Sequence, residues 1–74
     1  MTRLPTLKAR TLIKIVTRLG FTKVRQEGSH AFFKHPDGRT IVIPVHAGKD
    51  IGKGLLHSIL DDMMLTAKDL QKLL

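Results

Sequence analysis

Histidine is the residue type in this chain best suited to proton transfer. The four histidines are His30, His35, His46 and His57, and an imidazole can exchange a proton near neutral pH. Cysteine is absent, which excludes a thiolate metal site and a cysteine nucleophile. Glu27 is the only glutamate, and the aspartates fall in predicted turns or on late helices. A mechanism built on paired carboxylates therefore lacks its parts.

His30 is the sharpest candidate for chemistry. It follows Gly28-Ser29 at the start of a predicted strand, with Arg25 and Lys34 nearby in the sequence. Neighbouring cations favour the neutral imidazole and would hold a phosphodiester. A ribonuclease needs a base for the 2′-hydroxyl proton, a donor for the leaving oxygen and cations on the phosphate. An exposed histidine that only contacts RNA, or only bonds a loop, fits the same residues.

Ser29 and the other histidines carry weaker signals. A Ser29 nucleophile with His30 as its base is disfavoured, because adjacent strand residues point apart and no orienting acid is evident. A turn that places the histidine is the simpler interpretation of Gly28-Ser29. We expect His35 to make a turn-stabilising hydrogen bond, while His46 could contact substrate.

A metal site is not expected. No pair of histidines has the usual helical ligand spacing, and no acid or thiol completes a zinc shell. His57 lies on a predicted helix and is expected to be a surface residue. The sequence therefore predicts a protein without a cofactor.

Periodicity predicts the elements that position these residues. Apolar side chains at helical spacing over 6–19, followed by Gly20, predict a first helix. Three segments of β-type composition, separated by turn signals, predict an antiparallel meander. These segments are 21–26, 30–35 and 40–44.

The remainder of the chain is predicted to be a loop and two helices. Residues 45–54 are rich in glycine and are expected to be a loop. A second helix is expected over about 54–63, and a third from Thr66, whose hydroxyl can cap the backbone N–H of Asp69. The order predicts a two-layer α+β fold in a single domain over residues 1–74.

Alternation sorts the strand side chains onto two faces. The face expected against the helices carries Val24, Ala31, Phe33, Ile41 and Ile43. The opposite face, called the open face below, is expected to display Lys23, Arg25, His30, Phe32, Lys34, Thr40 and Val42. A bulge would reverse part of this assignment. Phe32 would then be buried; otherwise it can stack on an unpaired base or contact a protein partner.

The charge distribution favours a polyanionic partner. The formal net charge is +7, and residues 1–53 carry 11 of the 13 Lys and Arg side chains. Nucleic acid is the first expectation from such a balance. No apolar run approaches the length of a membrane span, and the N-terminus does not read as a secretory signal. We therefore expect a cytoplasmic protein.

Several motifs together resemble the HicA toxin family of bacterial and archaeal toxin–antitoxin systems, over about residues 5–74. They are Leu19-Gly20-Phe21, Arg25-Gln26, Gly28-Ser29-His30, His35-Pro36-Asp37-Gly38-Arg39, Val42-Ile43-Pro44-Val45-His46 and Gly54-Leu55-Leu56-His57-Ser58-Ile59-Leu60. The resemblance implies a double-stranded-RNA-binding-like α-β-β-β-α fold that acts as a metal-independent mRNA interferase. It also implies a HicB antitoxin that covers the active face. The catalytic histidine of the family's Gly-Ser-His corresponds to His30.

We also predict a set of substrate-binding residues. Its members are Lys23, Arg25, Gly28, Ser29, Phe32, Lys34, Arg39 and His46.

The chain departs from the family pattern at several positions. Lys8 stands where a small helix-capping residue is common, and Phe32 and Val42 make the open face more apolar. Met64 replaces a glycine between the last two helices, which predicts either a merged helix or a strained turn. Asp61 and Asp62 replace residues that are often neutral or basic, but none of these changes removes His30.

Two other functions fit the same residues. A non-catalytic RNA-binding domain of this fold would recognise A-form geometry through phosphates and 2′-hydroxyls. A protein-interaction module would use its basic strand face only to dock an acidic antitoxin. Loss of cleavage on His30→Ala separates the nuclease from the binder, and a steep salt dependence of RNA affinity separates both from the docking module.

Overall fold

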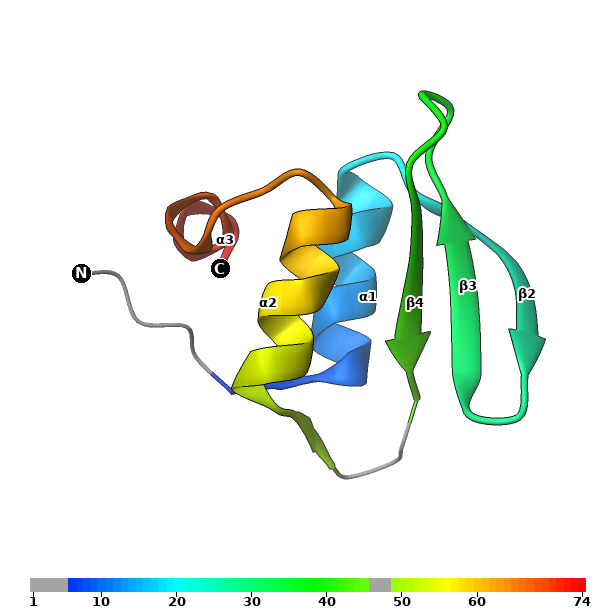
Figure 1. Cartoon of the computed structure of the whole chain (residues 1–74), viewed down its shortest axis with the longest axis horizontal. Helices are drawn as coiled ribbons and strands as arrows, with labels where there is room; N and C mark the ends of the chain where they lie inside the picture. The colour runs from blue at the N-terminus through cyan, green and yellow to red at the C-terminus, as the bar shows by residue number, and fades with distance from the viewer. Residues whose placement is uncertain (1–5, 46–48) are drawn as a thin grey trace.

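The computed structural model describes residues 6–45 and 49–74. It is an α+β fold in which a helix precedes a three-stranded antiparallel sheet and two helices follow it (Figure 1). The elements in chain order are β1 (Leu7–Lys8), α1 (Ala9–Arg18), β2 (Thr22–Glu27), β3 (His30–Lys34), β4 (Thr40–Pro44), β5 (Asp50–Ile51), α2 (Lys53–Asp62) and α3 (Ala67–Leu73). The predicted fold class and the α-β-β-β-α order with a short third helix are confirmed.

The main sheet has the order β2-β3-β4, and α1 and α2 cover one of its sides. In Figure 1 the strand β2 lies farthest from the helices. Every residue of β2 is exposed, whereas β3 and β4 alternate buried and open positions. The core joins the inner faces of β3 and β4 to the apolar sides of α1 and α2. Its fully buried members include Leu12, Val16, Ala31, Ile43, Leu56 and Met63.

A second, two-stranded sheet forms where the sequence predicted other structure. Leu7 pairs with Ile51 and Lys8 with Asp50 in antiparallel register. Both apolar members are buried, so the pairing fastens the chain before α1 to the chain before α2. The predicted helix start at residue 6 and the uninterrupted loop over 45–54 were wrong, because two-residue strands leave no periodic signal.

The face assignment of β2 was partly wrong, because the strand contains a bulge. Lys23 pairs with Phe33 and Arg25 pairs with Phe32, so Val24 has no partner of its own. Val24 does not face the helices; its side chain is 55% exposed. Every residue of β2 is exposed, including Lys23, which pairs with the buried Phe33. An irregularity is therefore inexpensive at this edge.

The turn between α2 and α3 is strained rather than merged. Met64 has φ 61, a left-handed conformation that costs a residue with a Cβ about 1–2 kcal/mol. Thr66 then caps α3 as predicted: its hydroxyl accepts from the Asp69 N–H at 3.1 Å, and the Asp69 carboxylate accepts from the Thr66 N–H at 2.9 Å. The backbone donation from Thr66 holds the pKa of Asp69 below its ordinary value.

Candidate functional site

His30 stands at one end of the sheet, directly after the β2–β3 turn. Gly28 and Ser29 form this turn, which places His30 opposite Glu27 on one side and Pro44 on the other. Gly28 has φ 58 while Ser29 stays in the ordinary negative region, as in a type II′ hairpin with glycine first. The predicted turn at Gly28-Ser29, directly before His30, is confirmed.

The imidazole of His30 is available to a ligand. The residue is exposed, and its ring makes no hydrogen bond to any residue in the part of the chain that the structure describes. The Val45 N–H donates to the Ser29 carbonyl, which extends the backbone pairing past the end of β4. The backbone around His30 is therefore held while its side chain is not.

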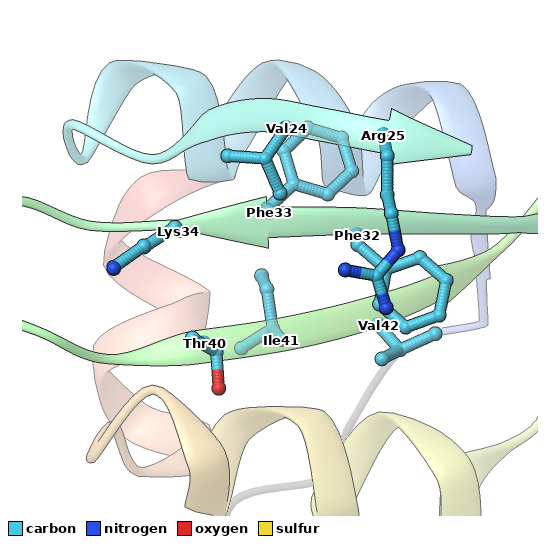
Figure 2. A pocket seen from close by; sticks show the side chains of 8 residues that line it. All are labelled: Val24, Arg25, Phe32, Phe33, Lys34, Thr40, Ile41 and Val42. Carbon is cyan, nitrogen blue, oxygen red and sulfur yellow. The ribbon is translucent and has the colours of Figure 1, made fainter.

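The next row of the open face consists of Arg25, Phe32 and Val42. Figure 2 looks onto this face and shows the Arg25 side chain reaching from β2 across the ring of Phe32. The guanidinium carbon lies 4.1 Å from the ring centroid, within the range of a cation–π contact. Phe32 is half-buried by its neighbours and belongs to the open face. Its burial in the core, one of the three interpretations of the sequence, is thereby excluded.

Arg25 is also oriented by a carboxylate. Its Nε donates to Glu27 Oε2 at 2.6 Å, so Glu27 belongs to the site although the sequence reasoning did not include it. A two-residue turn puts the residues before and after it directly across from each other. Reading the turn as Gly28-Ser29 alone would have placed Glu27 beside His30.

Lys34 occupies the opposite end of the open face. It pairs with Thr22 and Thr40, two rows away from His30. At about 3.3 Å per residue, four residues separate the two backbone positions by roughly 13 Å. A hollow between these rows is lined on the open side by Val24, Arg25, Phe32, Lys34, Thr40 and Val42 (Figure 2). Lys34 thus borders the same surface as His30 without being its neighbour.

Lys23 does not join this surface. The bulge at Val24 places Lys23 level with Phe33, on the side of the sheet that faces the helices. There its ammonium donates to Gln26 Oε1 at 2.5 Å. The prediction of Lys23 on the open face was wrong, because simple alternation assumes a strand without a bulge.

Arg39 lies at the far end of the β3–β4 hairpin and makes structural contacts. Its Nε donates to Asp37 Oδ2 at 2.7 Å, and a terminal nitrogen donates to the Met63 carbonyl at 2.5 Å. The guanidinium also lies 5.2 Å from the centroid of the Phe21 ring. The structure therefore does not bring Arg39 to His30; it ties the hairpin to the end of α2.

His35 makes the turn-stabilising hydrogen bond that the sequence predicted. Its Nδ1 accepts from the Asp37 N–H at 3.1 Å and its Nε2 lies 3.0 Å from the Leu19 carbonyl. Both ring nitrogens of His35 therefore have a backbone partner. The ring also packs edge-on against Phe21, with centroids 5.1 Å apart.

Gly20 allows this close approach of His35. Its φ is +99, and a Cβ at this position would lie 2.9 Å from His35 Nε2. Asp37 completes the cluster: its Oδ1 lies 3.0 Å from His35 Nδ1 and accepts from the Arg39 N–H. That backbone donation is the main reason why the pKa of Asp37 is below its ordinary value.

The remaining expectations concern His46, metals and membranes. His46 lies outside the described residues. Within the described part of the chain, no three His, Asp or Glu side chains are close enough together to bind a metal ion. Over the same residues, no helix has the length and apolar character needed to cross a membrane.

Comparison with known proteins assigns the family. Residues 9–65 of the 74 match the family described as the HicA toxin of bacterial toxin–antitoxin systems. The matched range contains α1, the whole main sheet and α2, and therefore the open face and His30. No curated protein sequence matches the chain. The chain belongs to the HicA toxin family and is the toxin component of a toxin–antitoxin pair.

Proposed function

We propose that this toxin is an mRNA interferase, a metal-independent endoribonuclease that uses His30 for proton transfer at the open face. The observation that supports this most strongly is the state of the His30 ring. It is an exposed imidazole without a hydrogen bond in the described chain, on a backbone held by two strand neighbours. An imidazole in that state can exchange a proton with a bound substrate.

Arg25 is the cation best placed to bind the reacting phosphate. It is one row from His30, whereas Lys34 is two rows away. Glu27 accepts from its Nε, which leaves the two terminal NH₂ groups to donate to phosphate oxygens. Glu27 and Phe32 hold the guanidinium in place, so less side-chain entropy is lost when a phosphate binds.

The proposed reaction is an internal transesterification. His30 takes the proton of a 2′-hydroxyl, and the resulting oxygen forms a bond to the adjacent phosphorus as the bond to the 5′-oxygen breaks. The leaving oxygen takes a proton from His30 or from water. Arg25 stabilises the negative charge that develops on the phosphoryl oxygens. The products are a 2′,3′-cyclic phosphate and a 5′-hydroxyl.

The antitoxin partner follows from the family, and its proposed contact surface is the open face. We propose that a HicB-like antitoxin covers His30 and the apolar side chains beside it. Val24 and Val42 expose 55% and 37% of their surface there. An apolar centre rimmed by charged side chains suits a protein interface.

Cleavage by the wild type and by His30→Ala tests the enzymatic proposal. A mixed single-stranded and structured RNA is incubated with each protein in the presence of EDTA, and fragments are followed on a gel. His57→Ala serves as the matched control, because His57 is exposed on α2 and outside the open face. The proposal expects fragments from the wild type and the control alone.

Other outcomes of that experiment would replace the proposal. Intact RNA in every lane, with a mobility shift, would indicate the non-catalytic RNA-binding domain. Equal cutting by all three proteins would place the chemistry on another residue, and His46 would be tested next.

A further inference from the structure

The exposed side of α1 carries a row of three cations outside the open face. Arg10, Lys14 and Arg18 follow one another at intervals of four residues, and all three are exposed. On a helix this spacing stacks them on one side, each about 6 Å further along the axis. No hydrogen bond or ion pair joins any of them to another residue of the described chain. We call them the α1 row.

The α1 row destabilises α1, because its like charges repel one another and no acidic residue in the helix offsets them. The helix contains no acidic residue, and Lys8 at its N-cap makes no side-chain capping bond. Like charges four residues apart destabilise a helix by about 0.2–0.5 kcal/mol per pair. Arg10 adds a positive charge near the N-terminus, where the helix dipole favours a negative one. Only Arg18, in the last turn, suits the dipole.

The α1 row and the open face lie on different layers of the fold. The buried residues of α1 include Leu12 and Val16, which join the core beneath Ala31 and Ile43 of the sheet. The α1 row is on the other side of the same helix. An RNA that reaches both surfaces must therefore pass around the edge of the molecule, which a short oligonucleotide cannot do.

We propose that the α1 row is a second RNA-binding surface, which holds the phosphate backbone of the strand that flanks the segment at the open face. Three cations at this spacing span about 12 Å, the axial length of roughly three or four nucleotides at about 3.4 Å each. Binding there is electrostatic and independent of base sequence. This inference goes beyond cleavage, because the α1 row contains no group that transfers a proton near neutral pH.

The test compares two triple variants with equal loss of charge. One variant is Arg10→Gln, Lys14→Gln and Arg18→Gln. The matched control removes three exposed cations from α2 and α3 by Lys53→Gln, Lys68→Gln and Lys72→Gln. Both triple variants are made in a His30→Ala parent, so that the RNA stays intact. Affinity for single-stranded RNAs of about 4 and 30 nucleotides is measured against salt concentration.

The proposal expects the largest change for the α1-row variant with the long RNA. The slope of log affinity against log salt should become shallower by up to about 2, since each single-strand phosphate contact contributes about 0.7. The control should keep the slope of the His30→Ala parent, and the short RNA, which cannot reach both surfaces at once, should show a smaller change in slope than the long RNA. Thermal unfolding should show the α1-row variant at least as stable as the parent, since like-charge repulsion is removed.

Two results would overturn the proposal. If the two triple variants weaken binding equally, total charge matters and the α1 row does not. If the α1-row variant keeps the parent slope, the α1 row is a solvated face or contacts an acidic protein. The proposed enzymatic activity fails separately, when the wild type leaves RNA intact, and that failure would not alter the measured slopes.

Discussion

Two histidines five residues apart differ in their surroundings: His30 is the first residue of β3, and His35 directly follows its last residue. His35 has both ring nitrogens bonded, packs on Phe21 and exposes only 21% of its side chain. His30 is exposed and its ring has no hydrogen bond among the described residues. The His30 ring is therefore open to a ligand, while His35 is part of the fold.

Hydrogen bonding, and not membership of a motif, distinguishes the two histidines. Both histidines lie in family motifs, beside a glycine-containing turn. At the His35 end the turn folds back on α1, since the Leu19 carbonyl and Gly20 meet the ring. At the His30 end, the Gly28-Ser29 turn follows β2, and every residue of β2 is exposed. Packing and hydrogen bonds fix the His35 ring, whereas the His30 ring lacks such contacts among the described residues and is exposed to a ligand.

Replacing His35 should produce the largest loss of stability. His35→Ala removes two hydrogen bonds and the contact with Phe21, and it leaves the Leu19 carbonyl and the Asp37 N–H without these partners. At about 1 kcal/mol per bond plus the lost packing, we expect the free energy of unfolding to fall by about 2–4 kcal/mol. Urea denaturation measures it. His30→Ala is the control, with an expected change within about 0.5 kcal/mol. Equal losses of unfolding free energy in the two variants would contradict a structural role for His35 that His30 lacks.

Arg25 and Lys34 lie at different distances from His30 on the open face. Arg25→Ala should slow RNA cleavage by roughly tenfold to a hundredfold, because it removes the cation nearest His30. Lys34→Ala should change the rate by less than about threefold, since two rows separate it from His30 and its charge is screened by solvent. Single-turnover rates provide the measurement. Similar losses in the two variants would mean that the phosphate lies elsewhere on the face.

Substitutions of Met64 test the strain in the turn after α2, where Arg39 donates to the Met63 carbonyl. Met64→Gly should raise the free energy of unfolding by about 0.5–1 kcal/mol, because glycine adopts the left-handed conformation without the Cβ penalty. Met64→Ala keeps the Cβ and should give no such gain. Thermal denaturation of both variants is the measurement. A gain for alanine equal to that for glycine would show that removing the exposed methionine side chain, and not the strain, matters.

The smallest expected effect is the loss of stability when acid protonates Asp37, which contacts His35. The pKa of Asp37 lies below its ordinary value of 3.8, chiefly because the Arg39 N–H donates to the carboxylate. The lowered folded-state pKa stabilises the protein at pH values above the ordinary pKa, and this contribution is lost as the pH falls through that value toward the folded-state pKa. Unfolding temperatures of the wild type and Asp37→Asn should therefore converge below pH 4. The exposed Asp61→Asn is the control, and an unchanged gap between wild type and Asp37→Asn at low pH would contradict the assignment.

Much of the fold was accessible from the sequence because burial leaves periodic signals. Ala31, Phe33, Ile41 and Ile43 alternate as expected and are buried. Thr66 caps its helix, as its position three residues before Asp69 indicated. These features depend on neighbours in the sequence, or on a strand that has helices on one side.

The features that were missed depend on long-range geometry. The β1–β5 pairing joins residues more than forty positions apart through two-residue strands, too short to show a period. The bulge at Val24 places Lys23 on the helix side of the sheet and leaves Arg25 on the open face. No side-chain pattern marks this bulge, because every residue of the edge strand β2 is exposed. The contacts of Arg39 with Met63 and Phe21 depend on how α2 packs. Sequence reasoning therefore grouped Arg39 with the site.

The most direct test of the comparison measures RNA cleavage per folded molecule for His30→Ala and His35→Ala, well below the unfolding temperature of each. His30→Ala is predicted to unfold like the wild type and to lose cleavage by at least about a hundredfold, as expected when a general acid or base is removed. His35→Ala is predicted to lose stability and to cleave at nearly the wild-type rate while folded. Wild-type cleavage by a folded His30→Ala protein would contradict the assignment of chemistry to the free histidine.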